Sequence, residues 1–563
     1  MTAAGKLAQK KTNGSSMLGT LMFPFLSYFL TNNPIPDGYP WGKLTDWDNN
    51  PYSNYPNTGV VRTYDFTVSR GIIAPDGYER DVLLVNGAFP GPLIEVNWGD
   101  KVVVHVHNNI TGPEEGTAIH WHGLLQQGTP WEDGSPGISQ CPIAPSKSLT
   151  YEFIADLYGT SWYHSHYSAQ YADGVTGPIV VHGPTQARYD IDVGPIMLSD
   201  WHHRDYYDIV TEMLAPHGNP RVTSDNNLIN GKMNFDCSTV AAGDTTACTP
   251  DAGLAKFKFQ QGKTHRLRLI NSGADGIQQF SIDNHTMTVI ANDFTPIHPY
   301  TTTTVTLAVG QRTDVLVTAS AASTTSVWMR SRLTCASSLQ PLALAAVYYN
   351  DANPNLAPTS TPSPLSPTTN QCANDDLSLT APLFPMPLFR NESDVALWKF
   401  NNISMRTNYN TPSLLQVLSG NPTFPPERNI LNFHANTSVR LVVVNRSPGP
   451  HPMHLHGHNP YILAEGLGTW DGITTTRPEN PLRRDVQVVR AGGFLVLQFD
   501  ANPGVWGFHC HIAWHASGGF MAGLVVRPDV VVGMTVPGKV EETCEGWEVW
   551  TRGNVVEQID SGT

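Results

Sequence analysis

Runs in which apolar and other residues alternate with a period of two recur along this chain. The clearest are KVVVHVHN at Lys101–Asn108, HRLRLIN at His265–Asn271 and VRLVVVN at Val439–Asn445. Residues two apart in a β-strand lie on the same face, so this pattern predicts strands with one buried face. Gly (48) and Pro (44) are frequent and only 15% of residues are charged, which favours many short strands over long helices. We therefore predict an all-β protein.

The three runs are followed by different segments. The first leads to HWH at 120–122 and the third to HLH at 454–456, whereas the second leads to QFS at 279–281. Two further similar segments, WYHSH at 162–166 and GFHCH at 507–511, stand near the ends of the first and third units. This repetition predicts three consecutive β-sandwiches, with histidines in the first and third. We expect the functional site between those two units.

The length of the chain also points to several domains. Domains typically hold about 150 residues, so 563 residues are too many for one hydrophobic core. Pro, Ser and Thr are frequent in residues 350–370, which indicates an extended linker. The tail after Arg527 is polar and is expected to be loop-like. The expected organisation is a leader at 1–58, sandwiches at 59–185 and 186–349, a linker at 350–380 and a third sandwich at 381–563.

Charge and cysteine content narrow the class of protein. The net charge is −14 at pH 7 and no basic stripe occurs, which argues against a nucleic-acid partner and leaves room for a small neutral or cationic substrate. Seven cysteines form an odd set, as expected for three disulfides and one thiol kept for chemistry in an oxidising compartment.

An apolar segment near the start bears on localisation. Residues 17–30 (MLGTLMFPFLSYFL) follow Lys6, Lys10 and Lys11, and the run has the length of a signal-peptide core. With seven Asn-x-Ser/Thr sequons, it predicts a secreted, extracellular glycoprotein. No small-x-small cleavage site follows Leu30, so a retained N-terminal membrane anchor is the alternative.

Four His-x-His pairs carry the strongest chemical signal, because each can present two imidazoles on one strand face. The pairs are His120/His122, His164/His166, His454/His456 and His509/His511. One such pair would ordinarily be a surface feature, but four pairs at matching places in two repeats indicate a shared metal site. Eight imidazoles without carboxylates favour copper over calcium or magnesium and exceed the needs of a structural zinc.

Cys510 lies between the last two histidines and must project to the opposite face of its strand. With His451 upstream and His515 downstream it makes the His₂Cys set of a blue-copper centre. The alternative is an inert buried thiol or half of a disulfide, which would leave His451 and His515 without a role. The path His509-Cys510-His511 would carry single electrons to a cluster that reduces dioxygen, a four-electron reaction suited to four coppers.

Four segments resemble the signature sequences of multicopper oxidases, over roughly residues 60–563. They are HWHG (120–123), HSH (164–166), HPMHLHGH (451–458) and HCHIAWH (509–515). The segments DGSPGISQCPI, LING, RRD and the terminal DSG further resemble ascomycete fungal laccases. The resemblance implies three cupredoxin-like Greek-key domains and four copper ions.

By this resemblance each ligand has an expected copper. His120 and His454 would hold type 2 copper, and His451, Cys510 and His515 would hold type 1. The type 3 pair would be held by His122, His164, His166, His456, His509 and His511. Phe520 takes the family's axial position and cannot coordinate, which should raise the potential; Met521 is expected to be a packed thioether.

Acidic residues near these centres are expected to handle protons. By resemblance, Asp133 would serve the cluster, whereas Ala513 stands where several relatives have an acid, and Asp560 would substitute for it. The tail would plug a channel to the type 3 coppers, although Thr563 departs from the usual apolar ending. Beside His515, Asp275 is the first candidate to take the proton of a phenolic donor and Asp225 the second; either could be an ordinary loop acid.

The resemblance also pairs Cys141 with Cys544 and Cys335 with Cys372, which leaves Cys237 for Cys248. The predicted function is a monomeric laccase that couples one-electron oxidation of phenolic donors to reduction of O₂ to water. Two alternatives stay open: a ferroxidase or other metal oxidase on the same scaffold, and a non-catalytic copper-binding cupredoxin protein. The second would be expected to have lost ligands, yet all eleven ligand positions are filled.

Overall fold

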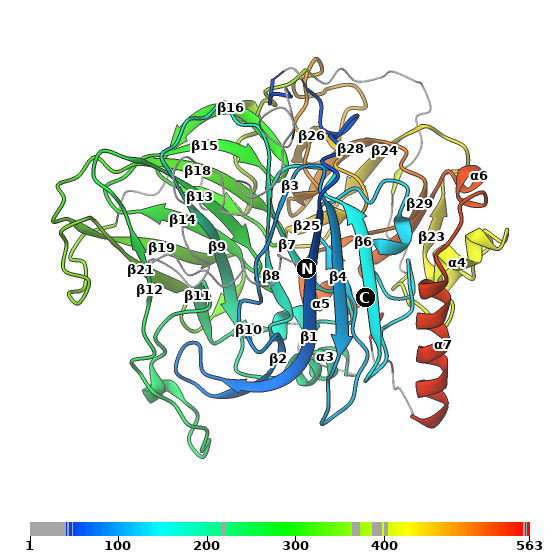
Figure 1. Cartoon of the computed structure of the whole chain (residues 1–563), viewed down its shortest axis with the longest axis horizontal. Helices are drawn as coiled ribbons and strands as arrows, with labels where there is room; N and C mark the ends of the chain where they lie inside the picture. Colours follow the sequence, from blue (N-terminus) through cyan, green and yellow to red (C-terminus); the bar gives the residue numbers. More distant parts are fainter. Residues whose placement is uncertain are drawn as a thin grey trace.

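The computed structural model describes residues 41, 44–47, 49–215, 221–362, 372–385, 403–554, 558 and 560–562, together with the backbone of 397–398. The leader with the apolar run 17–30 lies outside these residues. Figure 1 shows the second sandwich (green) on one side, and the first (blue to cyan) and third (yellow to orange) beside it. Within the described chain, no helix is long and apolar enough to cross a membrane.

The first sandwich is built from eight strands. They are β1 (Val61–Ile73), β2 (Arg80–Val85), β3 (Ile94–Asn97), β4 (Lys101–Asn108), β5 (Ile119–Trp121), β6 (Ser148–Ile154), β7 (Gly159–Ser165) and β8 (Thr176–His182). Their sheet orders are β2-β1-β4-β6 and β3-β8-β7-β5. Strand β4 buries Val102, Val104 and Val106 and turns the residues between them outward, as its period of two predicts.

The second sandwich is the largest. Its strands are β9 (Ile191–Trp201), β10 (Thr223–Ser224), β11 (Asn226–Ile229), β12 (Ala255–Lys258), β13 (Thr264–Asn271), β14 (Ile277–Ile282), β15 (Met287–Asn292), β16 (Thr295–Thr302), β17 (Val305–Leu307), β18 (Arg312–Thr318), β19 (Ser326–Thr334), β20 (Ser337–Ser338) and β21 (Leu342–Tyr348). The main sheets have the orders β11-β9-β13-β18-β15-β16 and β12-β21-β19-β14-β17, and β10 pairs with β20. The repeat at 265–271 is thus a strand, as predicted, and the sheet order places it inside its sheet.

The third sandwich carries the second set of histidine pairs. Its strands are β22 (Leu397–Trp398), β23 (Ile430–Asn432), β24 (Ser438–Val444), β25 (His451–Leu455), β26 (Tyr461–Leu467), β27 (Val486–Val489), β28 (Gly493–Asp500), β29 (Gly504–Cys510) and β30 (Met521–Val526). Their orders are β22-β24-β28-β26 and β23-β30-β29-β25-β27. The predicted all-β class with three sandwiches is therefore confirmed.

The few helices lie between and around the sandwiches. They are α3 (Tyr206–Leu214), α4 (Ser413–Leu418), α5 (Ala513–Ser517), α6 (Pro528–Val531) and α7 (Gly538–Gly553). The prediction of a loop-like tail after Arg527 was wrong, because α6 and α7 lie there. Helix α7 buries Val540 and Trp547, seven residues apart on one face, turns most of its polar residues to solvent and contacts β6 (Figure 1).

Three disulfides form in the pairs that the sequence analysis favoured. Cys141 is bonded to Cys544, Cys237 to Cys248 and Cys335 to Cys372. The first ties α7 to the first sandwich across 403 residues of sequence. Cys510 is the free cysteine and is fully buried, so the odd thiol is the cysteine for which a chemical role was predicted.

Candidate metal centres

Eight histidines from the first and third sandwiches converge in one buried cluster. Antiparallel pairing places His120 of β5 directly beside His164 of β7, and His454 of β25 beside His509 of β29. The second member of each pair lies two residues further along, on the same face. All eight side chains are at most 4% exposed. The four His-x-His pairs, which are far apart in sequence, thus meet as predicted.

The ring nitrogens of these histidines point at one another. The separations are 3.0 Å between His456 Nε2 and His509 Nε2, and 3.4 Å between His166 Nε2 and His509 Nε2. Across the cluster His454 Nε2 lies 3.5 Å from His120 Nε2. His164 Nε2 is buried without a hydrogen-bond partner in the described chain. Nitrogens gathered this closely, with the unpartnered Nε2 of His164 among them, are suited to hold metal ions.

Burial keeps the imidazoles in the neutral form that binds metals. Desolvation lowers the pKa of His122, His164, His166, His454, His456 and His511 well below the ordinary value, and neighbouring histidines add to the effect. Burial also lowers the pKa of His509, to about 4. A neutral imidazole offers a lone pair, so the donor set fits copper.

Backbone carbonyls and carboxylates orient the rings. The Nδ1 atoms of His120 and His454 lie 2.8 and 3.0 Å from the carbonyl oxygens of Asp133 and Asp485. His122 is turned the other way: its Nε2 lies 2.8 Å from Asp485 Oδ1, and its Nδ1 lies 3.3 Å from His511 Nε2. Hydrogen bonds of this kind select the tautomer and leave the other nitrogen free for a metal.

The second sandwich has no member of the histidine cluster, yet it contacts the cluster through Gly310 and Arg312. An added Cβ at Gly310 would lie 3.0 Å from His511 Cδ2 and 3.2 Å from His122 Cε1. Arg312 donates two hydrogen bonds to Asp485, at 2.6 and 2.7 Å. Asp485 and Arg312 were not predicted from the sequence; the RRD triplet ending at Asp485 was the available signal for the first.

A second centre surrounds the free thiol. Cys510 Sγ lies 3.6 Å from His451 Nδ1 and 3.5 Å from His515 Nδ1. Burial lowers the pKa of His515 to about 4, and burial together with His515 lowers that of His451 to about 3. His515 is partly exposed. Two neutral imidazoles and one sulfur at these separations match a small, soft-ligand copper site with an edge open to solvent.

Phe520 and Met521 lie differently relative to this centre. The Phe520 ring centroid is 4.8 Å from that of His451. Met521 pairs with His509 across β29 and β30, so its side chain shares the face of His509 rather than that of Cys510. It is fully buried in an apolar cluster with Ile138 and Val505. This is the packed thioether that the sequence analysis expected.

Of the four candidate acids, Asp133 and Asp560 lie on the side of the histidine cluster. Asp133 Oδ2 is 3.0 Å from His456 Nδ1 and accepts a hydrogen bond from Ser135 Oγ at 2.7 Å. Asp560 accepts hydrogen bonds from the hydroxyl of Ser168, two residues after His166, and from the backbone of the tail. Burial raises the pKa of Asp560.

The other two acids lie in the second sandwich. The loop holding Asp275 reaches α5, because Ala274 O accepts a hydrogen bond from Ala513 N at 2.8 Å. Burial raises the pKa of Asp275 to about 7, and the nearby Asp200 adds to the rise. Asp225 instead accepts a hydrogen bond from the backbone of His203 at 2.7 Å. Asp275 is therefore the acid whose loop contacts the helix of His515.

Comparison with known proteins identifies the family. Models described as multicopper oxidase match residues 67–186, 192–352 and 397–530. Laccase-2 of Botryotinia fuckeliana is 38% identical over 547 residues, covering 93% of this chain and 92% of that one. Dihydrogeodin oxidase of Aspergillus terreus is 36% identical over 515 residues, covering 84% of each chain.

Comparison with solved structures leads to the same family. The laccase from Botrytis aclada superposes with a TM-score of 0.82 at 36% identity, over 93% of this chain and 98% of that one. Fet3p, described as a multicopper oxidase that functions in iron import, gives 0.74 at 27% identity, over 89% and 98%. This chain belongs to the multicopper oxidase family, a class of copper enzymes. More narrowly, it is a laccase-like oxidoreductase.

Proposed function

We propose that this protein is a laccase that oxidises phenolic donors one electron at a time and reduces dioxygen to water. The observation that carries the proposal is the segment His509-Cys510-His511. Cys510 Sγ faces His451 and His515, whereas the two flanking histidines belong to the eight-histidine cluster. Three consecutive residues thus connect a partly exposed donor edge to a buried oxygen site.

The ligands divide between centres as the family resemblance implies. His451, Cys510 and His515 would hold type 1 copper, and His120 and His454 type 2. The type 3 pair would be held by His122, His164, His166, His456, His509 and His511. Copper ions bound there would accept single electrons and deliver four of them to dioxygen. By the same resemblance Phe520 would stand at the axial position, where its phenyl ring could not donate to the copper.

The phenol is proposed to bind beside the exposed edge of His515. Asp275 would take the phenolic proton, because burial raises the pKa of its carboxyl to about 7 and makes it a base suited to near-neutral pH. Its loop is fixed by Asp200, whose carboxylate accepts hydrogen bonds from the backbone of Ala274 and Asp275 at 2.6 and 2.9 Å. Asp225 is the less favoured base, since the backbone of His203 engages it.

Protons consumed in oxygen reduction would come through Asp133 and Asp560. Asp133 contacts His456 directly, and Asp560 contacts Ser168 behind His166. The tail that brings Asp560 there is held by Ser561, whose backbone N–H donates to Ser517 O at 2.8 Å. This placement supports the proposed plug. Thr563 lies outside the described residues.

A metal oxidase is the second candidate function, because Fet3p shares the fold at 27% identity. Binding of ferrous iron would need several free carboxylates beside His515. The hydrogen bond from the backbone of His203 engages Asp225, which favours the phenol as the donor.

We further propose that the chain is secreted as a monomer, in line with its three disulfides. Its proposed units are 59–185, 186–349 and 381–563.

The test uses the copper-loaded protein in an oxygen electrode with 2,6-dimethoxyphenol, beside a visible spectrum and a ferrous-iron control. The laccase proposal expects phenol-dependent oxygen uptake and an intense blue band, and loss of both in Cys510→Ser. Activity on iron but not on phenol would favour the metal oxidase. Absence of the blue band in a fully loaded protein would contradict the assignment of Cys510.

A further inference from the structure

A pocket of about 710 Å³ lies where the first and second sandwiches meet Trp41 and residues 44–47. Tyr158 and the stretch 181–189 line one wall, and strands β13, β15 and β16 of the second sandwich contribute to the other. None of the described residues that line it is a candidate copper ligand or one of the four candidate acids. Its volume falls in the range of pockets that bind small organic molecules.

Aromatic side chains supply much of the lining. Trp41 and Trp47 precede the first sandwich, Tyr189 follows it, and Phe294 lies between β15 and β16. Phe294 is fully buried, whereas Trp47 is 45% exposed. Flat aromatic walls of this kind favour a flat aromatic guest, because ring faces and edges pack with large contact area.

Two buried polar atoms of the pocket have no partner in the described chain. They are Asp46 Oδ1 and Tyr158 Oη, on residues that are 2% and 5% exposed. The other carboxylate oxygen of Asp46 accepts a hydrogen bond from Gln186 N at 2.7 Å, which fixes the side chain. Burial raises the pKa of Tyr158, and Asp46 adds to this effect, which indicates that the two groups are neighbours. Buried polar groups are nearly always hydrogen-bonded, so these two atoms are placed to take hydrogen bonds from a molecule bound in the pocket.

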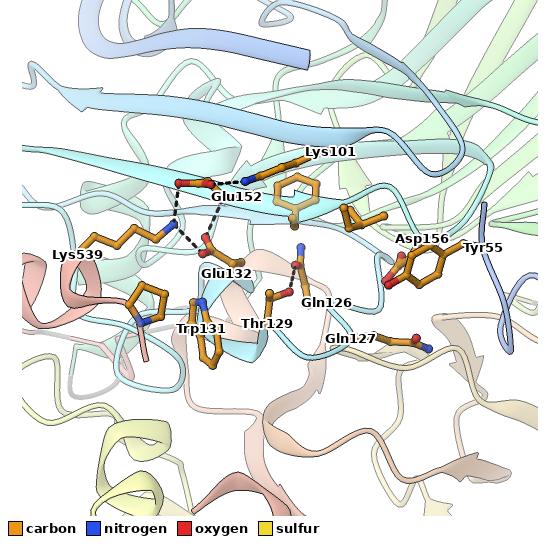
Figure 2. Close-up of a pocket in the computed structure, with 13 residues that line it drawn as sticks. Tyr55, Lys101, Gln126, Gln127, Thr129, Trp131, Glu132, Glu152, Asp156 and Lys539 are labelled. Atoms are coloured by element: carbon orange, nitrogen blue, oxygen red, sulfur yellow. Dashed lines mark hydrogen bonds and ion pairs between the residues drawn. The ribbon is translucent and has the colours of Figure 1, made fainter. Parts of the chain in front are cut away.

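Another pocket in the described part of the chain differs in how its polar groups are paired. It has a volume of about 520 Å³ and is drawn in Figure 2. Four of its charged groups already form two ion pairs: Lys101 with Glu152 at 2.7 Å, and Lys539 with Glu132 at 2.8 Å. Tyr55 also lines this pocket, which makes it a matched control for Tyr158.

We propose that the 710 Å³ pocket is a second binding site, separate from the oxidation site, for a small aromatic molecule carrying a hydroxyl group. An ionised carboxylate only accepts hydrogen bonds, whereas a phenolic hydroxyl both donates and accepts. One ligand hydroxyl satisfies both protein atoms: its O–H donates to Asp46 Oδ1 and its oxygen accepts from Tyr158 Oη. The ring then packs against the tryptophans at the mouth and Phe294 inside.

The test is calorimetric titration of the copper-loaded protein with 3,4-dimethoxybenzyl alcohol, which has a hydroxyl but no phenolic O–H. One site per chain is expected. Asp46→Asn keeps an acceptor for Gln186 N but can present an N–H donor to the pocket, and should weaken binding about tenfold to a hundredfold. Tyr158→Phe should weaken it about tenfold, and Tyr55→Phe should leave it unchanged.

A second probe isolates the hydroxyl. The methyl ether of the same alcohol should bind the unmodified protein at least about tenfold more weakly, and this difference should disappear in Asp46→Asn. Retention of the blue band and of phenol turnover shows that the variants fold. Absence of binding at about millimolar ligand, or affinities unchanged in both Asp46→Asn and Tyr158→Phe, would overturn the proposal; so would a crystal structure of the soaked protein with only water in the pocket.

Discussion

The guanidinium of Arg312 donates two hydrogen bonds to the carboxylate of Asp485, and the same carboxylate lies 2.8 Å from His122 Nε2. Arg312 belongs to the second sandwich, Asp485 to the third and His122 to the first, and all three side chains are fully buried. Arg484 extends the network by pairing with Asp293 at 2.9 Å. The sandwich that contributes no histidine to the cluster therefore helps to position a ring that does belong to it.

Replacing Arg312 with Met should destabilise the protein by about 3–5 kcal/mol, because Asp485 would keep a buried charge without its main partner. The pairing of Arg484 with Asp293 does not compensate, since it uses a different carboxylate. Urea unfolding and the copper content of the purified variant measure the effect, and we expect less than four coppers per chain. Arg527→Met is the control, because its pair with Asp529 is exposed. Equal stability of the two variants would contradict the role of Arg312.

Introducing Met at Phe520 should lower the potential of the type 1 centre. A thioether in the axial position adds a weak donor that stabilises the cupric state, whereas the phenyl ring beside His451 cannot donate. Redox titration of the blue band measures the potential, and phenol turnover should fall with it. Met521→Leu is the matched control, because that side chain shares the face of His509 and should not change the potential.

The role of Asp275 predicts a particular dependence on pH. Its raised pKa of about 7 means that the carboxyl becomes an available base only as the pH rises through that value. Phenol kcat/KM should therefore fall as pH drops below about 7, and Asp275→Asn should remove this limb and lose about a hundredfold in kcat/KM. Ferrocyanide, a donor that releases no proton, provides the control reaction. An unchanged phenol profile in the variant would exclude Asp275 as the base.

The raised pKa of Asp275 also makes the free energy of unfolding depend on pH. Asp275 ionises near its ordinary pKa of 3.8 in the unfolded chain and near 7 in the folded one. Between these values the folded state binds more protons, so this group's contribution to the free energy of unfolding decreases as pH rises. Thermal unfolding of the unmodified protein and of Asp275→Asn between pH 4 and 7 compares the two slopes, and the variant should show the weaker decrease.

Deleting the last four residues should alter oxygen reduction. The deletion removes the Asp560 carboxylate and the hydrogen bond between Ser561 N and Ser517 O. We expect slower turnover at saturating phenol and a shifted pH profile, measured with the oxygen electrode. Asp560→Asn separates the two functions of the tail, because it keeps the chain in place but removes the acid. If turnover and its pH profile are the same in both variants as in the full chain, the proposed plug and the proposed proton role of Asp560 are both contradicted.

The period of two along the chain and the His-x-His pairs determined much of this protein from the sequence alone. Alternation at Lys101–Asn108 predicted β4 because side-chain direction in a strand is a local property. The same local geometry places Cys510 on the face opposite His509 and His511, so the two centres were predictable. Helix α7 was not, since the few apolar residues of its buried face are outnumbered by polar ones.

Only the tertiary structure decided which distant residues support these centres. Arg312 and Asp485 are separated by 173 residues, and nothing in the sequence around Arg312 marks it as a partner of a copper-site residue. The same holds for Asp46 and Tyr158, whose unpartnered atoms become meaningful only where a pocket brings them together. The face of a strand on which a side chain lies, and the spacing of the ligands, depend on local geometry and can be predicted from the sequence. Contacts between sandwiches depend on how complete domains pack, which no local pattern specifies.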